Sequence, residues 1–291
     1  MKIDLHAHSS WSDGSETVEN LFREAKTREV DVVALTDHDT TRGWAEAREI
    51  AAELGIGFIP GIEITTRAHP AGEKSFGVHL LAYLPDPNNE ALSSALENTL
   101  RLREERLAQM FELIRAEYDL DWQDVLDQLR NGATHGRPSI AAALVSKGHF
   151  ASTADVFDNL WAPGSAFYIP NKDVVDTIDA IRLVVAAGGV PIIAHPMSRG
   201  KGPEVGEAMP VAHFEEMIAA GLAGFEVDHR DVPPHAQKWL REMAVKHDLI
   251  VTGSSDYHGN RKENLLGENT TSTEMLERII AQATGAKAQL Q

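Results

Sequence analysis

Two histidines that lie one residue apart stand near the start of the sequence, in the stretch DLHAHSSWSDG. His6 and His8 fall on a segment typical of a first β-strand, and Asp13 follows in a Ser-Asp-Gly turn. Side chains at positions i and i+2 of a strand point to the same face, with Cα atoms about 6.6 Å apart. Two imidazoles placed in this way could converge on one metal ion, and the turn could fold Asp13 back toward it. Alone, the pair is equally well explained as two structural histidines, so further ligands must be sought along the chain.

The elements that would position these residues are indicated by short apolar segments. Most of the segments are continuously apolar, which is typical of strands buried on both faces of a parallel sheet. Helical patterns lie between several of them, with Ser15 or Thr17 as a candidate N-cap and Gly55 as a candidate helix end. This alternation predicts βαβ units and a parallel sheet. The predicted strands lie in residues 2–8, 30–38, 57–66, 75–84, 190–196, 224–229 and 249–258.

One part of the chain lacks a convincing strand pattern. From about residue 88 to residue 188 the apolar residues follow helical spacing, with capping residues at the ends of several segments. We therefore predict that residues 89–187 form a helical insertion between the fourth and fifth strands, which we expect to cap the active site. Residues 1–88 and 188–291 would then form the catalytic unit.

Side chains that commonly bind metals fall on six of the seven predicted strands, most of them at the strand ends. In a parallel β/α barrel the catalytic groups gather at the carboxyl ends of the strands. A carboxylate in an apolar segment is costly unless it is paired, hydrogen-bonded or bound to metal. We therefore predict a site for several metal ions. The nine candidate residues on these strands are His6, His8, Asp37, His38, Glu63, His79, His195, Asp256 and His258, and Asp13 could join them from its turn.

The composition is that of a soluble globular enzyme, with 291 residues, 43% hydrophobic and 24% charged. The absence of cysteine excludes disulfides, thiolate nucleophiles and Cys-type zinc sites. A formal net charge of −17 argues against non-specific binding to nucleic acid, duplex DNA included, and to anionic membranes. The sequence contains neither an apolar segment of transmembrane length nor a signal-peptide core, which predicts a cytoplasmic protein.

At this point the sequence resembles the PHP family, named for polymerase and histidinol phosphatase. The motifs DLHAHSSWSDG, TDHDT, GIEITT, AHP and GSSDYHG occur together and in the family's order. The resemblance implies an α/β fold, a distorted (β/α)7 TIM-like barrel, that holds two or three divalent ions. It also implies three ligand sets, of which the first two share Glu63 as a bridge: His6, His8, Glu63 and Asp256; Glu63, His79 and His195; Asp13, His38 and His258.

Within the family, one branch is more similar to this chain. The stretches HGRPSIAAALV, FYIPN and GGVPIIAHP resemble those of nucleoside 3′,5′-bisphosphate phosphatases, although Ser139 replaces a histidine often found there. The resemblance implies release of the 3′-phosphate to give the 5′-mononucleotide. A 5′→3′ exoribonuclease that acts on short RNA is the alternative. Histidinol-phosphate-type phosphatases usually lack the insertion, so that activity ranks lower.

The chemistry follows from the ligand types. Three divalent ions and three carboxylates would leave a local charge of about +3, which attracts a phosphomonoester despite the acidic protein. Coordination would lower the pKa of a bound water and generate hydroxide for attack on phosphorus, while the ions stabilise the phosphoryl oxygens. Glu63, Asp256 and His258 are the predicted catalytic residues, with Asp256 or a cluster histidine as the general acid. Imidazole and carboxylate ligands make Mn²⁺ the first choice, with Fe²⁺ and Zn²⁺ as alternatives.

Four further residues are candidates for substrate binding: His135, Arg137, Lys172 and Arg199. Arg137 precedes Pro138 at a predicted helix start, and an arginine there suits bidentate contact with a second phosphate; a surface salt bridge is the alternative. Asp37 and Asp39 flank His38 and are expected to orient it. The remaining histidines, at positions 69, 149, 213, 229, 235 and 247, are expected to be structural or surface residues.

Two readings compete with a phosphatase. Amidohydrolase barrels also begin with a His-x-His pair, but they normally need a metal-bridging lysine on a mid-barrel strand. Lys74 falls at a strand start, and no lysine falls at a predicted strand end. The third reading is a metal-binding module without activity, against which the complete ligand set argues. Turnover of p-nitrophenyl phosphate with added Mn²⁺ would separate these readings.

Overall fold

The structure is a computed structural model that describes residues 1–291 except 129–135, 163, 172, 198–209 and 291. The chain divides into two compact units: residues 1–96 with 175–291, and residues 97–174. The predicted boundaries, at 88/89 and 187/188, differ from these. The helix over 177–186, which we expected in the insertion, belongs to the first unit. None of the helices among the described residues is long and apolar enough to cross a membrane.

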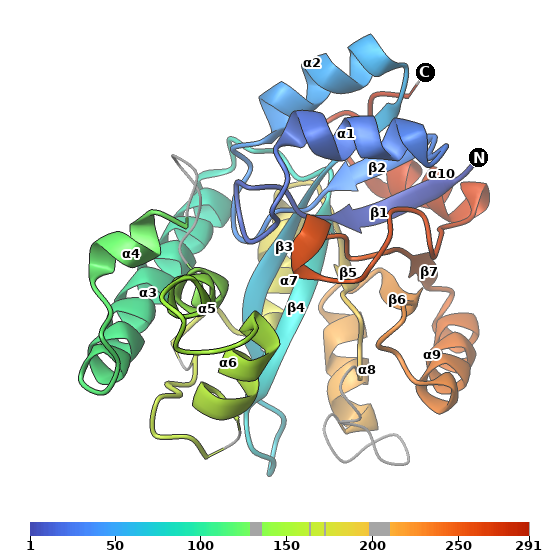
Figure 1. Cartoon of the computed structure of the whole chain (residues 1–291). Helices are drawn as coiled ribbons and strands as arrows, with labels where there is room; N and C mark the ends of the chain where they lie inside the picture. The colour runs from blue at the N-terminus through green and yellow to red at the C-terminus, as the bar shows by residue number, and fades with distance from the viewer. Residues whose placement is uncertain (129–135, 163, 172, 198–209, 291) are drawn as a thin grey trace. The chain divides into compact units, whose positions relative to one another are not determined.

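The first unit is built on a seven-stranded sheet whose strands follow one another in chain order (Figure 1). All seven predicted strands are present, which confirms the mixed α/β fold. An isolated parallel bridge between Ala7 and Tyr257, in which His8 N donates to Tyr257 O at 2.8 Å, links the first strand to the segment after the last. The strands are β1 (Ile3–Ala7), β2 (Val32–Leu35), β3 (Gly57–Ala68), β4 (Phe76–Tyr83), β5 (Val190–Ile193), β6 (Gly224–Asp228) and β7 (Ile250–Gly253).

The prediction of an entirely parallel sheet is wrong at β4. This strand pairs antiparallel with both β3 and β5, whereas the remaining neighbours pair parallel. Only residues 69–75 separate β3 from β4, a connection of hairpin length that is too short for the crossover helix of a parallel pair. Because β4 runs in reverse, its first half lies beside the second half of β3, and His79 faces the site from there rather than from a carboxyl end.

The continuous apolar character of the strands reflects burial on both faces. In β2, Val33 and Leu35 belong to the hydrophobic cluster that includes the packing helices, whereas Val32 and Ala34 belong to a second cluster with residues of the other strands. Alternate side chains of a strand point to opposite faces, so each face of the sheet has its own core. The sheet therefore gives a rigid base for the polar residues at its rim.

The helices of the first unit begin and end at signals readable in the sequence. Thr17 is the N-cap of the first helix and accepts a hydrogen bond from Asn20 N at 3.2 Å. The second helix ends at Gly55, whose φ of +64° suits glycine. The elements are α1 (Val18–Thr27), α2 (Trp44–Leu54), α7 (Thr177–Ala186), α8 (Val211–Ala219), α9 (Pro234–His247), α10 (Thr273–Gln282) and the short 3₁₀ turn η1 (Gly259–Arg261).

The second unit is helical in its described part, as predicted, and has a separate hydrophobic core. Ile114, Val125 and Ile140, from three different helices, are fully buried in this core. Helix α3 (Glu90–Arg115) starts in the first unit, and its residues from Glu97 onward belong to the second. The other helices are α4 (Trp122–Leu126), α5 (Arg137–Ser146) and α6 (Thr153–Leu160).

Candidate metal centre

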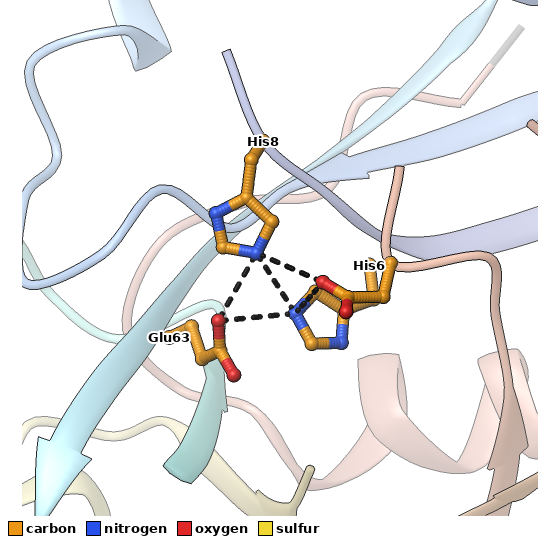
Figure 2. A group of neighbouring side chains, drawn as sticks. His6, His8 and Glu63 are labelled. Atoms are coloured by element: carbon orange, nitrogen blue, oxygen red, sulfur yellow. Dashed lines mark hydrogen bonds and ion pairs between the residues drawn. The ribbon is translucent and has the colours of Figure 1, made fainter. Parts of the chain in front are cut away.

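The site begins with the two histidines of the first strand. His6 lies in β1 and His8 directly follows it, so both rings point to one side, and their Nε2 atoms are 3.0 Å apart. Figure 2 shows these two rings and the Glu63 carboxylate, which comes from β3, directed toward one point. Two ring nitrogens at this distance need either a shared proton or a cation between them.

The Nδ1 atoms, which lie on the side of each ring away from the cluster, show where the rings carry a proton. His6 Nδ1 lies 2.9 Å from Glu226 Oε1, and His8 Nδ1 lies 3.3 Å from Ser12 Oγ, which itself donates to Asp37 Oδ1 at 2.6 Å. A carboxylate and a hydroxyl oxygen whose proton is already donated can only accept, so the Nδ1 atoms carry the protons. The Nε2 atoms of both rings therefore point inward, and they offer lone pairs once their own protons are displaced, as in metal-ligating histidines. Asp37, which we expected to orient His38, makes its hydrogen bonds to Ser9 and Ser12.

Glu63 lies at the centre of the cluster, with a different group of imidazoles around each oxygen. Its Oε2 atom is 3.2 Å from His6 Nε2 and 3.0 Å from His8 Nε2. Its Oε1 atom is 2.7 Å from His79 Nδ1 and 3.1 Å from His195 Nε2. A buried carboxylate whose two oxygens face separate ligand groups has the arrangement of a bridge between two cations.

A further group of ligand-type residues surrounds Asp13. His258 Nε2 lies 3.2 Å and His38 Nε2 lies 3.7 Å from the Asp13 carboxylate. His258 Nδ1 donates to the backbone carbonyl of Asp256 at 2.8 Å, which leaves a lone pair on Nε2. Asp13 Oδ1 is buried and has no hydrogen-bond partner among the described residues. A lone pair and an unpartnered carboxylate oxygen that face each other fit a cation, so the residues present suit a divalent metal.

Asp256 completes the first group. Its Oδ1 atom lies 3.4 Å from His6 Nε2 and 3.3 Å from His8 Nε2. The backbone of Asp256 has a φ of +53° and that of His195 a φ of +29°, both in the left-handed region that non-glycine residues rarely adopt. Such strain is typical of functional sites, because the surrounding structure must hold it in place.

The electrostatics of the cluster also indicate a cation site. Burial raises the pKa of Glu63, but neighbouring imidazoles, first that of His38, bring it well below its ordinary value. Burial lowers the pKa of His8, but hydrogen bonds with Asp256 and Glu63 raise it overall to about 9. The buried carboxylates therefore stay charged and need compensating positive charge. Divalent ions can supply this charge once they displace the ring protons.

All nine predicted ligands thus lie in one cluster of the first unit. Three groups have ligand atoms within 4.8 Å of one another, namely His6, His8, Glu63 and Asp256; His8, Asp13 and His38; and His38, Glu63 and His79. Of the four candidates for substrate binding, the structure describes only one. Arg137 lies in the second unit, whereas His135, Lys172 and Arg199 lie outside the described residues.

Sequence reasoning missed Glu226, which is fully buried at the end of the His6 ring away from the cluster. Its Oε1 atom accepts from His6 Nδ1 and from the hydroxyl of Ser254, and its Oε2 atom accepts from the backbone N–H of His195 at 2.7 Å. Glu226 therefore holds two of the candidate ligands in place. The signal was present, because GFEVDH carries a glutamate inside an apolar strand.

Replacement of Glu226 by glutamine should weaken metal binding about 10- to 100-fold, the usual cost of removing the partner of a ligating histidine. Glutamine keeps only one acceptor oxygen, so it cannot accept hydrogen bonds from both His6 Nδ1 and the backbone N–H of His195. Metal titration followed by calorimetry measures the effect. Glu274→Gln, in the first turn of α10, is the matched control. Equal metal affinity in both variants would contradict the role of Glu226.

Two further residues near the cluster were also missed. His229 is buried, with Nε2 3.7 Å from Asp256 Oδ2, whereas we expected a structural or surface residue. Lys262 Nζ lies 2.5 Å from the same Asp256 oxygen. The sequence shows a lysine after the last strand but gives no sign that it folds back onto the site.

The chain is similar in sequence to a known protein family and to proteins of known activity. The PHP domain profile matches residues 4–165. A phosphoribosyl 1,2-cyclic phosphate 1,2-diphosphodiesterase of Eggerthella lenta is 34% identical, over 88% of this chain and 94% of its own length. A 3′,5′-nucleoside bisphosphate phosphatase of Chromobacterium violaceum is 32% identical, over 88% and 87%. A 5′-3′ exoribonuclease of Salmonella typhimurium is 31% identical, over 88% and 84%.

A solved structure is similar over almost the whole chain. It is a protein of Bifidobacterium adolescentis that is assigned to the metal-dependent phosphoesterases. The two chains are 38% identical and superpose with a TM-score of 0.89, over 97% of this chain and 96% of the other. The profile match, the relatives and the buried cluster lead to one conclusion: the chain belongs to the PHP family and is a metal-dependent phosphoesterase.

Proposed function

We propose that this chain is a phosphatase that removes the 3′-phosphate from nucleoside 3′,5′-bisphosphates and releases the 5′-mononucleotide. The observation that carries the proposal is the convergence of imidazoles and carboxylates on Glu63, which provides a phosphoesterase site. The Chromobacterium violaceum relative, a 3′,5′-nucleoside bisphosphate phosphatase, supports the substrate class.

The proposed ligands form three sets, of which the first has the same members as one of the clusters described above. We assign one ion to His6, His8, Glu63 and Asp256, a second to Glu63, His79 and His195, and a third to Asp13, His38 and His258. Nitrogen and oxygen ligands without thiolate favour Mn²⁺, with Fe²⁺ and Zn²⁺ as alternatives. Bound ions of this kind lower the pKa of water and stabilise negative charge on phosphoryl oxygens.

The protein's own residues have three tasks in this proposal. Glu63 keeps the two groups of imidazoles at a fixed separation through its two oxygens. Glu226 and Ser12 hold the protons of His6 and His8 on the outer side of their rings. One of the cluster histidines gives a proton to the leaving oxygen, which ends the reaction with a neutral alcohol. Burial raises the pKa of Asp256, but the charges of His258 and Lys262 hold it well below the ordinary value, so Asp256 is less suited to this task than we expected.

Two arginines of the second unit lie against the ring of the same tyrosine, Tyr168. The guanidinium carbon of Arg137 lies 5.4 Å from the ring centre of Phe157 and 5.8 Å from those of Trp161 and Tyr168. Arg106 lies 5.7 Å from the Tyr168 ring centre. Burial, followed by the charge of Arg137, lowers the pKa of Arg106 to about 10. The proposal that Arg137 contacts a second phosphate rests on its guanidinium chemistry, which suits bidentate binding of phosphate.

Replacement of Arg137 by alanine should raise KM for a nucleoside 3′,5′-bisphosphate about 10- to 100-fold, because a charge-assisted hydrogen bond contributes about 1.5–3 kcal/mol. KM for a monophosphate substrate should change little. Steady-state kinetics on both substrates measures the difference.

Arg101→Ala is the matched control, because Arg101 lies on α3 and pairs with Glu105 at the surface. Thermal unfolding of both variants tests whether loss of the contacts with the three rings destabilises the second unit. An equal rise of KM for both substrates would remove Arg137 from the second-phosphate role. The expectation that the second unit caps the active site stays a prediction.

The relatives name two competing activities, so the decisive experiment is a substrate panel. The metal-loaded protein is assayed with a nucleoside 3′,5′-bisphosphate, phosphoribosyl 1,2-cyclic phosphate, a short RNA with a 5′-phosphate and histidinol phosphate. We expect the highest kcat/KM for the bisphosphate. A higher value for the cyclic phosphate would favour the activity of the Eggerthella relative, and a higher value for RNA that of the exoribonuclease.

A further inference from the structure

A buried histidine that is not among the nine candidate ligands faces the site. His229 follows β6, is 2% exposed, and its ring centre lies 5.3 Å from that of His195. Its Nδ1 atom accepts a hydrogen bond from the backbone N–H of Asp231 at 3.1 Å. An Nδ1 atom that accepts has no proton, so the proton of the neutral ring is on Nε2.

This tautomer is opposite to that of the ligand-type histidines. In His6 and His258 the Nδ1 proton is donated away from the cluster, and the Nε2 lone pair faces it. In His229 an N–H group faces the cluster instead, so the ring is a hydrogen-bond donor and not a metal ligand. Its Nε2 atom has no hydrogen-bond partner in the described part of the chain, because Asp256 Oδ2 is 3.7 Å away.

Lys262 brings a second donor to the same place. It follows the turn η1, and its Nζ atom donates to Asp256 Oδ2 at 2.5 Å while 40% of the side chain stays exposed. An ammonium group has three N–H donors, and no second acceptor for Lys262 occurs among the described residues. Two of its donors therefore remain for a ligand.

Asp256 thus separates two environments. Its Oδ1 atom faces the Nε2 atoms of His6 and His8, in the predicted metal cluster. Its Oδ2 atom faces Lys262 and His229, which offer only donors. A phosphate group held at the metals would have non-bridging oxygens left over, and donors at the edge of the cluster are suited to accept them.

We propose that His229 and Lys262 form an anion-binding pair that donates hydrogen bonds to a non-bridging oxygen of the substrate's phosphate group beside Asp256. The inference rests on the proposed phosphatase function and adds residues outside the family's ligand motifs that position the phosphate. The alternative is that both residues only hold Asp256 in place.

The experiment is calorimetric titration of inorganic phosphate into the Mn²⁺-loaded full chain, with metal content measured for every variant. Lys262→Met should weaken phosphate binding about tenfold, whereas Lys262→Arg, which keeps charge and donors, should stay within about threefold of the wild type. His229→Asn keeps an acceptor for Asp231 N–H but loses the outer donor, so it should also weaken binding. His229→Gln places an amide N–H near the Nε2 position and should restore it.

Lys246→Met is the matched control, because Lys246 pairs with Glu215 at the surface and should leave phosphate binding unchanged. Unchanged phosphate affinity in Lys262→Met and His229→Asn, with full metal content, would overturn the proposal. So would a loss of metal in both variants, because the pair would then act through Asp256 alone. Lys262→Gln replaces the methionine variant if thermal unfolding shows that the latter does not fold.

The titration measures phosphate binding and not turnover. A negative result for the anion-binding pair can therefore be told apart from a negative result for the proposed phosphatase function. A wild-type protein that binds phosphate through this pair but hydrolyses no phosphomonoester would contradict the phosphatase assignment alone.

Discussion

Replacement of Glu63 by glutamine is expected to lower phosphomonoester hydrolysis on the order of 10³-fold and to remove metal from the protein. Both oxygens of Glu63 have short contacts to imidazoles, the shortest 2.7 Å from His79 Nδ1. A neutral amide has one acceptor oxygen and one N–H₂ group, so half of the proposed bridge becomes a donor that repels a cation. Steady-state kinetics and elemental analysis of the purified variant measure the two effects.

The matched control is Glu19→Gln on α1, where the carboxylate is 53% exposed and pairs with Arg23. An exposed pair contributes little, so this variant should keep activity and metal content. A Glu63→Gln protein with near-normal turnover and full metal content would refute the bridging role.

Metal removal is expected to abolish activity, because the site has ligands for cations but no cysteine nucleophile to replace them. Dialysis against a chelator, followed by Mn²⁺, should restore turnover, and parallel additions of Fe²⁺ and Zn²⁺ rank the three metals. The thermal midpoint should also rise with added metal, because ions bind the folded cluster only. At a free metal concentration 100 times Kd the gain is about 2.7 kcal/mol.

The dependence of activity on the amount of bound metal provides an internal test of this prediction. Elemental analysis at each step should show activity that follows occupancy, to two or three ions per chain. Hydrolysis by protein that contains no metal would contradict the whole assignment. A rise in thermal midpoint with no turnover for any substrate would instead favour the metal-binding module.

Much of the site was predictable because strand periodicity fixes side-chain direction. His6 and His8 lie on one face by spacing alone, and the carboxyl ends of β2, β5 and β7 deliver His38, His195 and Asp256 to the same rim. The orientation of β4 was not predictable from its own residues, since a buried strand is apolar whichever way it runs. The short connection from β3 was the available sign.

The residues that sequence reasoning missed act through contacts distant along the chain. Glu226 meets His6 across 220 residues, and Arg106 reaches Ile169 O across 63. No rule of sequence spacing identifies the partner of either residue. Lys262 lies only six residues from Asp256, yet its direction depends on how η1 turns the chain. Such contacts follow from the folded arrangement of several loops, which periodicity does not determine.

The junction between β1 and the segment after β7 has a consequence for biosynthesis. His6 and His8 are translated long before Asp256, which shares an ion with them in our assignment. A nascent chain therefore exposes clustered imidazoles long before the carboxylate that completes their set is available. We expect tight metal capture only after translation has passed residue 258, so that the choice of metal depends on the ion pool met by the released protein.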